Sequence, residues 1–362
     1  MRQIARLRDE RRAIFRKKSY LLCVHDLPVA EFAKQFGITE IMPALCNVYY
    51  KPMELSRAKF IRKEICEVGN KCDYTICGDK YEYVFTHPEY TDEKGSGETD
   101  NFIAMLFETK GKKGNPVILF FHAMGVTGES SGRIAEYLQN EYFCIMPTST
   151  VYCEGQKYVS KADELRQIEE FLKENGVNNL ALVVASSIGA DLAVTFLSET
   201  KIPVGHAFFD GGQFAKIGKF TRRIMTPFLY FAIRSLYKKN GENLGKIMWC
   251  DDDVIKPYFV AAGKALKYGN IRRQMADSLE NKPFPPIGEN LQKHTFFEFG
   301  SIEDHYKYRE DVKKSYPYAH YPVFEGYNHM QYQIKDPKGF AEMLVSVIDK
   351  NEIPRFSFLK EN

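Results

Sequence analysis

The chain has 362 residues, of which 44% are hydrophobic and 27% charged, and it carries a net charge of +3. This is the composition of an ordinary globular protein with enough apolar material for a substantial core. The small net charge excludes the strongly basic class of nucleic-acid-binding proteins, so no nucleic-acid partner is expected. The length predicts one large domain with a smaller appended one.

Two features of the sequence favour a cytoplasmic protein without a membrane anchor. No apolar run approaches the roughly 18 residues that a transmembrane helix needs, and the opening residues "MRQIARLRDERRAIFRKK" contain no apolar core of a secretory signal. The eight cysteines are therefore expected to be free thiols in a reducing compartment. The sequence indicates no particular oligomeric state.

Composition divides the chain into a small N-terminal α+β segment, a linker and a larger domain. Residues 1–87 begin with a basic segment, for which a solvated helix face is expected, and continue into short extended runs near Arg62 and Cys72. Residues 88–101 are rich in Gly, Thr, Asp and Glu and predict a linker. The third region, 102–352, has a different pattern.

In this third region, short apolar runs alternate with segments of helical period. Strands are predicted over 102–108, 117–121, 142–146, 180–185, 206–209, 295–299 and 319–323. Helices are predicted between them, for example over 160–175 and 336–351. This alternation predicts an α/β fold with a mostly parallel sheet covered by helices on both faces. A run such as "VILFF" is apolar at every position, as a strand buried on both faces should be.

The interval 213–290 interrupts the alternation of strands and helices. It is long and reads as helical, with the segments "RRIMTPFLYFAIRSLYKK" and "KPYFVAAGKALKYGN". An insertion of this size between two sheet strands predicts a helical cap over one end of the sheet. Its aromatic and aliphatic residues favour a substrate whose acyl or alcohol group is partly apolar.

Two adjacent serines stand where the strand in "LALVVASSIGADLAV" turns into a helix. A nucleophile at such a corner needs small residues two positions before and two positions after it. Ser186 has Val184 and Ile188 at those positions, whereas Ser187 has Ala185 and Gly189. Ser187 is therefore the candidate nucleophile. The alternative is that this serine has a structural role and caps the following helix.

The remaining members of a catalytic site follow later strands. Glu303 and Asp304 come just after the strand predicted over 295–299, and His329 follows the next one. Neighbouring residues on an extended loop point in opposite directions, so one of the two acids is expected to hold the imidazole. We prefer Glu303 and keep Asp304 as the alternative, with Asp210 as a weaker third candidate.

The loop "FFHAMGVTG" after the strand 117–121 is the expected source of an oxyanion hole. The backbone amide of Met124 would join that of Ile188, so that two donors point at the oxygen of a tetrahedral intermediate. A dinucleotide-binding loop is the competing interpretation. The glycines here lack the G-x-G start, and no acidic residue directly follows the next strand, so this interpretation is disfavoured.

Residues from about 100 to 350 resemble the α/β-hydrolase superfamily. The matching blocks are "HAMG", "ASSIG", "FGSIED" and "GYNHMQY", and the order nucleophile, acid, histidine is the order of that superfamily. Ala185 and Ala123 stand where glycines are usual, and both are small. The resemblance implies an α/β-hydrolase fold, although the superfamily also includes members without hydrolase activity.

The expected chemistry is hydrolysis of a small-molecule acyl substrate. A carboxylic ester is the preferred substrate class, and a thioester or a small amide is the alternative. His329 would take the proton of Ser187 as it attacks the carbonyl, and water would release the acyl group. No metal or organic cofactor is expected. Cysteines 46, 66, 72 and 77 contain no C-x-x-C pair that would favour zinc.

Residues 36–80 resemble part of the L-2-amino-thiazoline-4-carboxylic acid hydrolases, through the region of Cys46, the run at Arg62 and Gly69 followed by "CDY". Tyr49 stands where an aspartate is usual, so no catalytic residue is carried over. A hairpin packed on the larger domain explains the same residues equally well. Two alternatives therefore stay open: a C–N or thiazoline-type hydrolase that involves this segment, and a ligand-binding protein on a hydrolase scaffold.

Overall fold

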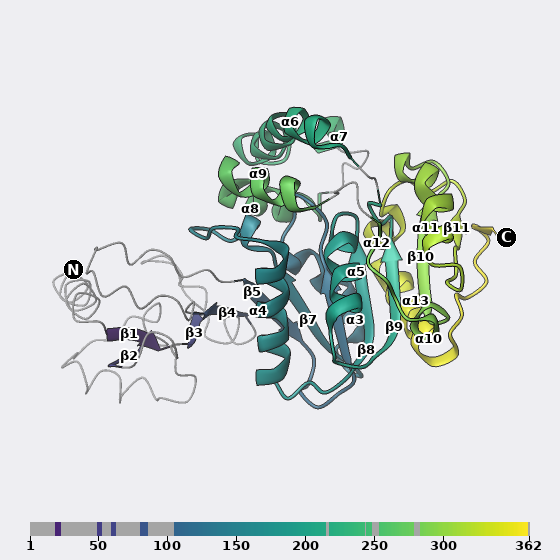
Figure 1. Ribbon diagram of the computed structural model, residues 1–362, viewed down its shortest axis with the longest axis horizontal. Helices are drawn as coiled ribbons and strands as arrows, with labels where there is room; N and C mark the ends of the chain where they lie inside the picture. The colour runs from purple at the N-terminus through teal and green to yellow at the C-terminus, as the bar shows by residue number, and fades with distance from the viewer. Residues whose placement is uncertain are drawn as a thin grey trace. The chain divides into compact units, whose positions relative to one another are not determined.

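The computed structural model describes residues 105–214, 217–242, 244–247, 253–278 and 283–360, together with the backbone of four short strands before residue 105 (Figure 1). The chain divides into two compact units, Met1–Glu108 and Thr109–Asn362. The predicted linker 88–101 and most of the segment that resembles the thiazoline hydrolases lie outside the described residues.

In the first unit, the described strands pair antiparallel. Strand β1 (Ser19–Leu22) pairs with β2 (Tyr49–Pro52). Strand β3 (Lys59–Arg62) pairs with β4 (Lys80–Phe85), which in turn pairs with the start of β5 (Leu106–Lys110). The predicted run near Arg62 is thus a strand, and its described partner is β4.

The second unit is built on a mostly parallel sheet. Its strands are β6 (Val117–Phe121), β7 (Phe143–Thr148), β8 (Leu180–Ser186), β9 (Val204–Asp210), β10 (Thr295–Gly300), β11 (Val323–Phe324) and β12 (Leu359–Lys360). Their order in the sheet is β12-β11-β10-β9-β8-β6-β7. The pairs from β7 to β11 are parallel, and β12 closes the edge antiparallel to β11. The predicted α/β architecture is therefore confirmed.

Helices of the second unit connect these strands and cover the sheet. They are η4 (Gly128–Ser131), α3 (Gly132–Leu138), η5 (Thr150–Tyr152), α4 (Lys161–Glu174), α5 (Gly189–Glu199), α6 (Lys219–Lys238), α7 (Leu244–Ile247), α8 (Lys256–Ala265), α9 (Tyr268–Asp277), α10 (Glu289–Gln292), η6 (Asp304–Tyr308), α11 (Arg309–Ser315), α12 (Gln331–Lys335) and α13 (Pro337–Lys350). The predicted helices 160–175 and 336–351 correspond to α4 and α13.

The boundaries of α4 and α13 follow from local sequence signals. The Ser160 side chain accepts a hydrogen bond from the amide of Asp163 and caps α4. Asp336 caps α13 in the same way, through the amide of Gly339, with Pro337 in the first helical position. Asn351 adopts the left-handed conformation that ends α13.

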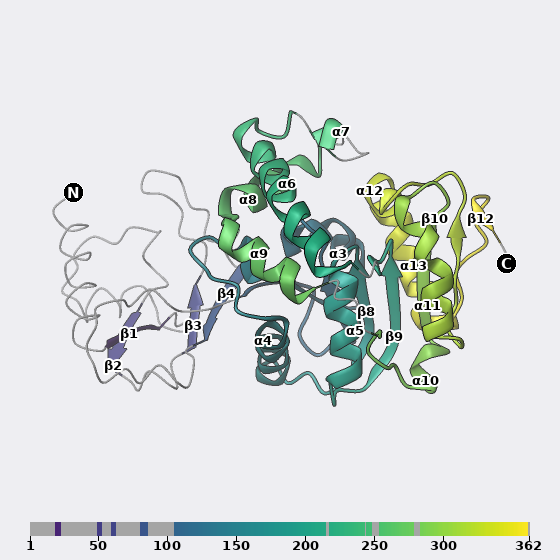
Figure 2. The ribbon, with the colours of Figure 1, turned by 45° about the horizontal axis from the view of Figure 1, so that its top comes forward.

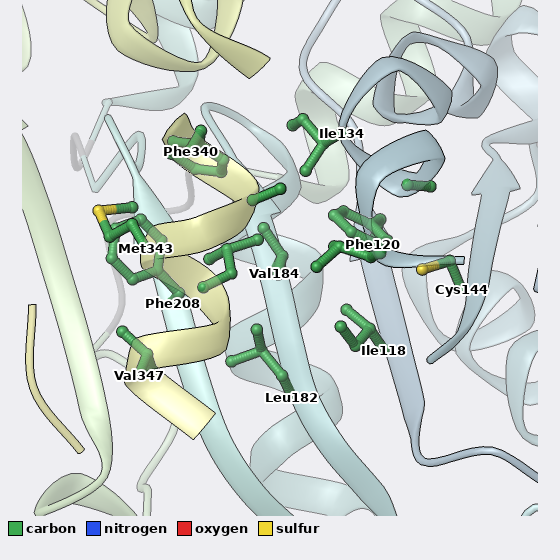
Figure 3. Packing of buried hydrophobic residues seen from close by; sticks show 14 of the residues in the cluster. Ile118, Phe120, Ile134, Cys144, Leu182, Val184, Phe208, Phe340, Met343 and Val347 are labelled. Atoms are coloured by element: carbon green, nitrogen blue, oxygen red, sulfur yellow. The ribbon is translucent and has the colours of Figure 1, made fainter. Parts of the chain in front are cut away.

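The main core lies between the sheet and the pair α3 and α13. Phe340, Met343 and Val347 of α13 face the sheet residues Val184 and Phe208 (Figure 3), and all five are almost fully buried. Burial of such side chains is worth roughly 1.5–3 kcal/mol each and holds the sheet as a rigid platform. The opposite face is covered by α4 and α5 (Figure 1).

The sheet order changes direction between β6 and β8. From β6 the chain first moves to β7 at one side and then returns to β8 at the other. In parallel sheets the loops that follow two such strands diverge and leave a crevice at their carboxyl ends, where ligands usually bind. Helices α6, α8 and α9 lie over this end of the sheet (Figure 2). No helix of the described residues is long and apolar enough to cross a membrane.

Candidate active site

Ser187 occupies a sharp turn between β8 and α5. Its φ of 53° lies in the left-handed region, which costs a non-glycine residue on the order of 1–3 kcal/mol, and strain of this kind clusters at functional sites. Gly189 makes the turn feasible, because a Cβ there would lie 2.6 Å from the carbonyl oxygens of Phe121 and His122. Ala185, two residues before Ser187, is fully buried.

The structure brings Ser187, His329 and Glu303 together in a single hydrogen-bonded row. His329 Nε2 lies 2.9 Å from Ser187 Oγ, and His329 Nδ1 lies 2.8 Å from Glu303 Oε2. Glu303 follows β10 and His329 follows β11, so both loops emerge at the carboxyl end of the sheet beside Ser187. The three residues were the preferred sequence candidates.

The other candidates lie in different surroundings. Asp304 is exposed at the start of η6, and no hydrogen bond joins it to His329 among the described residues. Ser186 is directed to Gln333, whose Nε2 donates to its Oγ at 3.0 Å. The same Nε2 donates to the buried carboxylate of Asp210 at 2.6 Å.

Glycines leave room for the close approach of these loops. A Cβ on Gly211, which follows β9 with a φ of +56°, would lie 2.6 Å from His329 Nδ1 and 3.0 Å from Glu303 Oε2. A Cβ on Gly300 would lie 2.3 Å from the carbonyl oxygen of Tyr327, in the loop that leads to His329. A side chain at Gly211 would displace His329 or Glu303, and one at Gly300 would displace the backbone of the loop that leads to His329.

Burial disfavours the charged forms of both His329 and Glu303. It lowers the pKa of His329 to about 4, against the raising effect of the Asp210 and Asp304 charges. Burial also raises the pKa of Glu303, whereas a backbone hydrogen bond at Gly300 acts in the opposite direction. As the pH rises, Glu303 therefore becomes ionised and accepts a hydrogen bond from the Nδ1–H of neutral His329. In this form the Nε2 lone pair of His329 is available to accept a hydrogen bond from the Ser187 hydroxyl.

His305 is a second imidazole beside this row. Its ring stands edge-on to that of His329, with centroids 4.6 Å apart, and the two Nδ1 atoms are 3.3 Å apart. Burial lowers the pKa of His305 to about 4, so it adds no positive charge at neutral pH. His305 is therefore an uncharged ring in contact with one face of His329.

Glu303, His305 and His329 each offer one ligand atom within 4.8 Å of the others, a spacing that a metal ion could bridge. His329 Nδ1 and Glu303 Oε2 already share a hydrogen bond, however. An ion there would take the place of the Nδ1 proton of His329, and the imidazole would no longer be held by the carboxylate.

The loop after β6 is fixed by His122. Its Nδ1–H donates to the carbonyl of Ala123 at 2.7 Å, and its Nε2 accepts from the amide of Ser149 at 3.0 Å. Burial lowers its pKa to about 4, consistent with this neutral tautomer. Met124 follows in the same loop, and its side chain lines the cavity beside Ser187. Among the hydrogen bonds of the described residues, none uses the backbone amide of Met124 or Ile188 as donor.

A cavity of about 390 Å³ opens at Ser187 and His329. This volume lies in the usual range of small-molecule sites, roughly 300–1,000 Å³. Its wall is mostly apolar and comes from the loop after β6, from α6 and α8, and from the segment after His329. The apolar lining residues are Ala123, Met124, Val126, Ile134, Phe228, Leu229, Ala232, Ile233, Leu236, Ile255, Phe259, Met330 and Ile334.

Comparison with solved structures identifies the fold. An α/β-hydrolase family protein from Desulfitobacterium hafniense superposes with a TM-score of 0.54 at 15% sequence identity, over 67% of this chain and all of that one. The chain has the α/β-hydrolase fold. A structure from a study of carboxylesterases of the thaumarchaeon Nitrososphaera gargenis gives a TM-score of 0.53 at 14% sequence identity, over 70% of this chain and 97% of that one.

A third similar structure, a bromoperoxidase from Bacillus anthracis, gives a TM-score of 0.53 at 14% identity, over 68% of this chain and 96% of that one. Proteins with different described activities thus share this fold, so the fold alone does not determine which activity a protein has. No protein-family model matches the sequence, and no curated protein matches it either.

Sequence reasoning missed three participants in this arrangement. Gly211 lies in "FFDGG", where a glycine pair directly after a buried strand could have indicated a close approach. His305 lies two residues after Glu303, but a histidine in a polar loop gives no signal by itself. Gln333, which holds Ser186 and Asp210, belongs to the short helix α12, and no sequence pattern places it there.

Proposed function

We propose that the protein is a serine hydrolase that cleaves a carboxylic ester through a covalent acyl-enzyme. The observation that carries this proposal is the row from Ser187 through His329 to Glu303, with separations of 2.9 and 2.8 Å, at the wall of an apolar cavity. A strained serine, a neutral histidine and a buried acid in this order are the parts that nucleophilic acyl transfer requires.

In the first half of the reaction, His329 Nε2 accepts the proton of Ser187 as Oγ attacks the ester carbonyl. Glu303 accepts the hydrogen bond of Nδ1–H, fixes the tautomer and stabilises the imidazolium. The unengaged amides of Met124 and Ile188 are the donors for the oxyanion, and each such donor is worth on the order of 10²–10³ in rate. His329 then protonates the leaving alcohol.

In the second half, water attacks the acyl-enzyme. His329 accepts a proton from the water, and it then returns this proton to Ser187 Oγ as the bond between Oγ and the acyl carbon breaks and the acid product leaves. A thioester would follow the same path, whereas an amide needs stronger protonation of its leaving group. The apolar wall from α6 and α8 would act as a cap that selects an apolar acyl or alcohol group.

The test is hydrolysis of p-nitrophenyl esters of increasing chain length by the wild type, Ser187→Ala and Ser186→Ala. Ser187→Ala is expected to lose activity by about 10⁴-fold or more. Ser186→Ala serves as the matched control and is expected to stay within a few-fold of the wild type. Equal activity of Ser187→Ala and the wild type would contradict the proposal.

The alternative in which the N-terminal segment contributes a C–N or thiazoline-type hydrolysis concerns residues 36–80, most of which lie outside the described part of the chain. It stays a prediction, and intact ring-opening activity in Ser187→Ala would support it.

A further inference from the structure

Helix α6 carries an apolar stripe on the side that faces away from the protein. Phe220, Ile224, Phe228 and Phe231 are 76%, 48%, 73% and 67% exposed. At about 100° per residue, these four positions fall within an arc of about 80°. Isolated exposed apolar residues are normal, but a contiguous stripe of three phenylalanines and an isoleucine indicates a surface that binds something.

The opposite side of α6 is already occupied by the fold. Ile233 and Leu236 are buried there, and Arg222 Nη1 donates to the carbonyls of Ala276 and Ser278, at the end of α9. Arg234 Nη1 donates to the carbonyl of Gly263, in α8. The helix is therefore held firmly by one side, and its exposed stripe is not the result of a loosely packed segment.

Two aromatic contacts through Tyr230 extend the stripe onto the neighbouring helix α9. The ring of Tyr230 lies 5.4 Å from that of Phe231 and 5.4 Å from that of Tyr268, in α9. Tyrosine rings with one apolar side and one polar end are typical of the boundary between lipid and water.

The charge of α6 indicates the chemistry of the partner. The helix contains five basic residues and no acidic one. Lys219, Arg223 and Lys238 are exposed. At about 100° per residue, Arg223 lies about 60° from the edge of the stripe, and Lys238 lies within its arc, about two turns after Phe231. An amphipathic helix with aromatic residues on one face, exposed lysine and arginine and no acidic residue has the composition of a segment that lies in the headgroup region of an anionic membrane.

The stripe also leads to the cavity. Phe228 belongs to both, because it is largely exposed and at the same time lines the cavity beside Ser187. An apolar molecule that leaves a lipid surface at α6 would reach the cavity without passing through bulk water.

We propose that α6 docks the protein on an anionic lipid surface, from which an apolar ester substrate enters the cavity. The second clause of this proposal rests on the proposed hydrolase function, whereas the docking itself does not. Binding is therefore measured separately from hydrolysis, in the Ser187→Ala background.

The binding test is flotation of full-length Ser187→Ala protein with vesicles of phosphatidylcholine and phosphatidylserine, and with vesicles of phosphatidylcholine alone. We expect binding to the anionic vesicles that weakens as salt is raised. Adding Phe220→Ser and Phe231→Ser is expected to weaken binding by at least about tenfold, since burial of one phenylalanine changes a partition coefficient by roughly that factor.

The matched control replaces two exposed tyrosines outside the stripe, Tyr137→Ser with Tyr318→Ser, and is expected to keep binding. Folding of both double variants is checked by circular dichroism. In the Ser187 background, both should hydrolyse a dissolved short-chain ester as the wild type does, because neither pair lines the cavity.

Three results would overturn the proposal. The protein could stay unbound with anionic vesicles, or the Phe220 and Phe231 variant could bind as tightly as its parent. Light scattering could instead show a dimer that the same two substitutions dissociate, in which case the stripe binds a second copy of the chain. Vesicle binding without ester hydrolysis would leave docking intact and contradict only the hydrolase proposal.

Discussion

Replacement of Gly211 by alanine tests whether the geometry around His329 controls activity. The new Cβ would lie 2.6 Å from His329 Nδ1, whereas ordinary contact begins near 3.4 Å. The imidazole must therefore move by about 0.8 Å, and its hydrogen bonds to Ser187 and Glu303 cannot both keep their lengths. A misplacement of about 1 Å costs on the order of 10²-fold in rate, so kcat/KM is expected to fall about 10²-fold.

The same substitution also strains the backbone, because the φ of Gly211 is +56°. Gly176→Ala provides a matched control for this effect. Its φ is +69°, and an added Cβ would meet nothing within 4 Å. Gly176 lies between α4 and the start of β8, at the end of the sheet away from Ser187. Both variants should lose about 1–2 kcal/mol of unfolding free energy.

The assay compares ester kcat/KM and the urea midpoint of unfolding for the two variants. Loss of activity in Gly211→Ala alone, at similar stability, would support the geometric argument. Full activity in a folded Gly211→Ala protein would refute it, as would an equal loss of activity in Gly176→Ala.

Four further outcomes are expected. Glu303→Gln should lower kcat/KM by about 10³–10⁴-fold, whereas Asp304→Asn should stay within about threefold. The pH profile of the wild type should lose activity as the pH falls through the raised pKa of Glu303, and in Glu303→Gln this acid limb should move to lower pH. His305→Ala should admit water and raise the pKa of His329 from about 4 toward its ordinary 6.5, as followed by histidine NMR. Phe340→Ala should cost about 3–5 kcal/mol in chemical denaturation, because this ring is fully buried.

The sheet was predictable because its strands carry a strong local signal. "VILFF" is apolar at all five positions, and β6 spans the predicted residues 117–121. The strand expected over 319–323 is shorter in the structure, where β11 covers only Val323–Phe324 and a single bridge joins His320 to Phe296. Pro322 has no N–H to donate to the ladder, so regular pairing is interrupted between the bridge at His320 and β11.

Parts of the site were predictable because chain topology brings them together. The loops after β8, β10 and β11 meet at one edge of a parallel sheet, so the sequence indicated that Ser187, His329 and an acid at 303 or 304 would lie together. The small neighbours Ala185 and Gly189 favoured Ser187 over Ser186, whereas the choice between Glu303 and Asp304 stayed open. The contact of His305 with His329 depends on how two loops pack, and no residue pattern encodes that packing. Likewise, the helical character of α6 was visible in the sequence, but the exposure of its phenylalanines depends on which side α8 and α9 cover.

The most direct test of the central claim is to identify the residue that a fluorophosphonate modifies. The wild-type protein is labelled at neutral pH, digested and analysed by mass spectrometry, with Ser186→Ala and Ser187→Ala treated in parallel. The account predicts a phosphonate on Ser187 in the wild type and in Ser186→Ala, and none in Ser187→Ala. Modification of Ser186, or no modification of a correctly folded wild type, would contradict it.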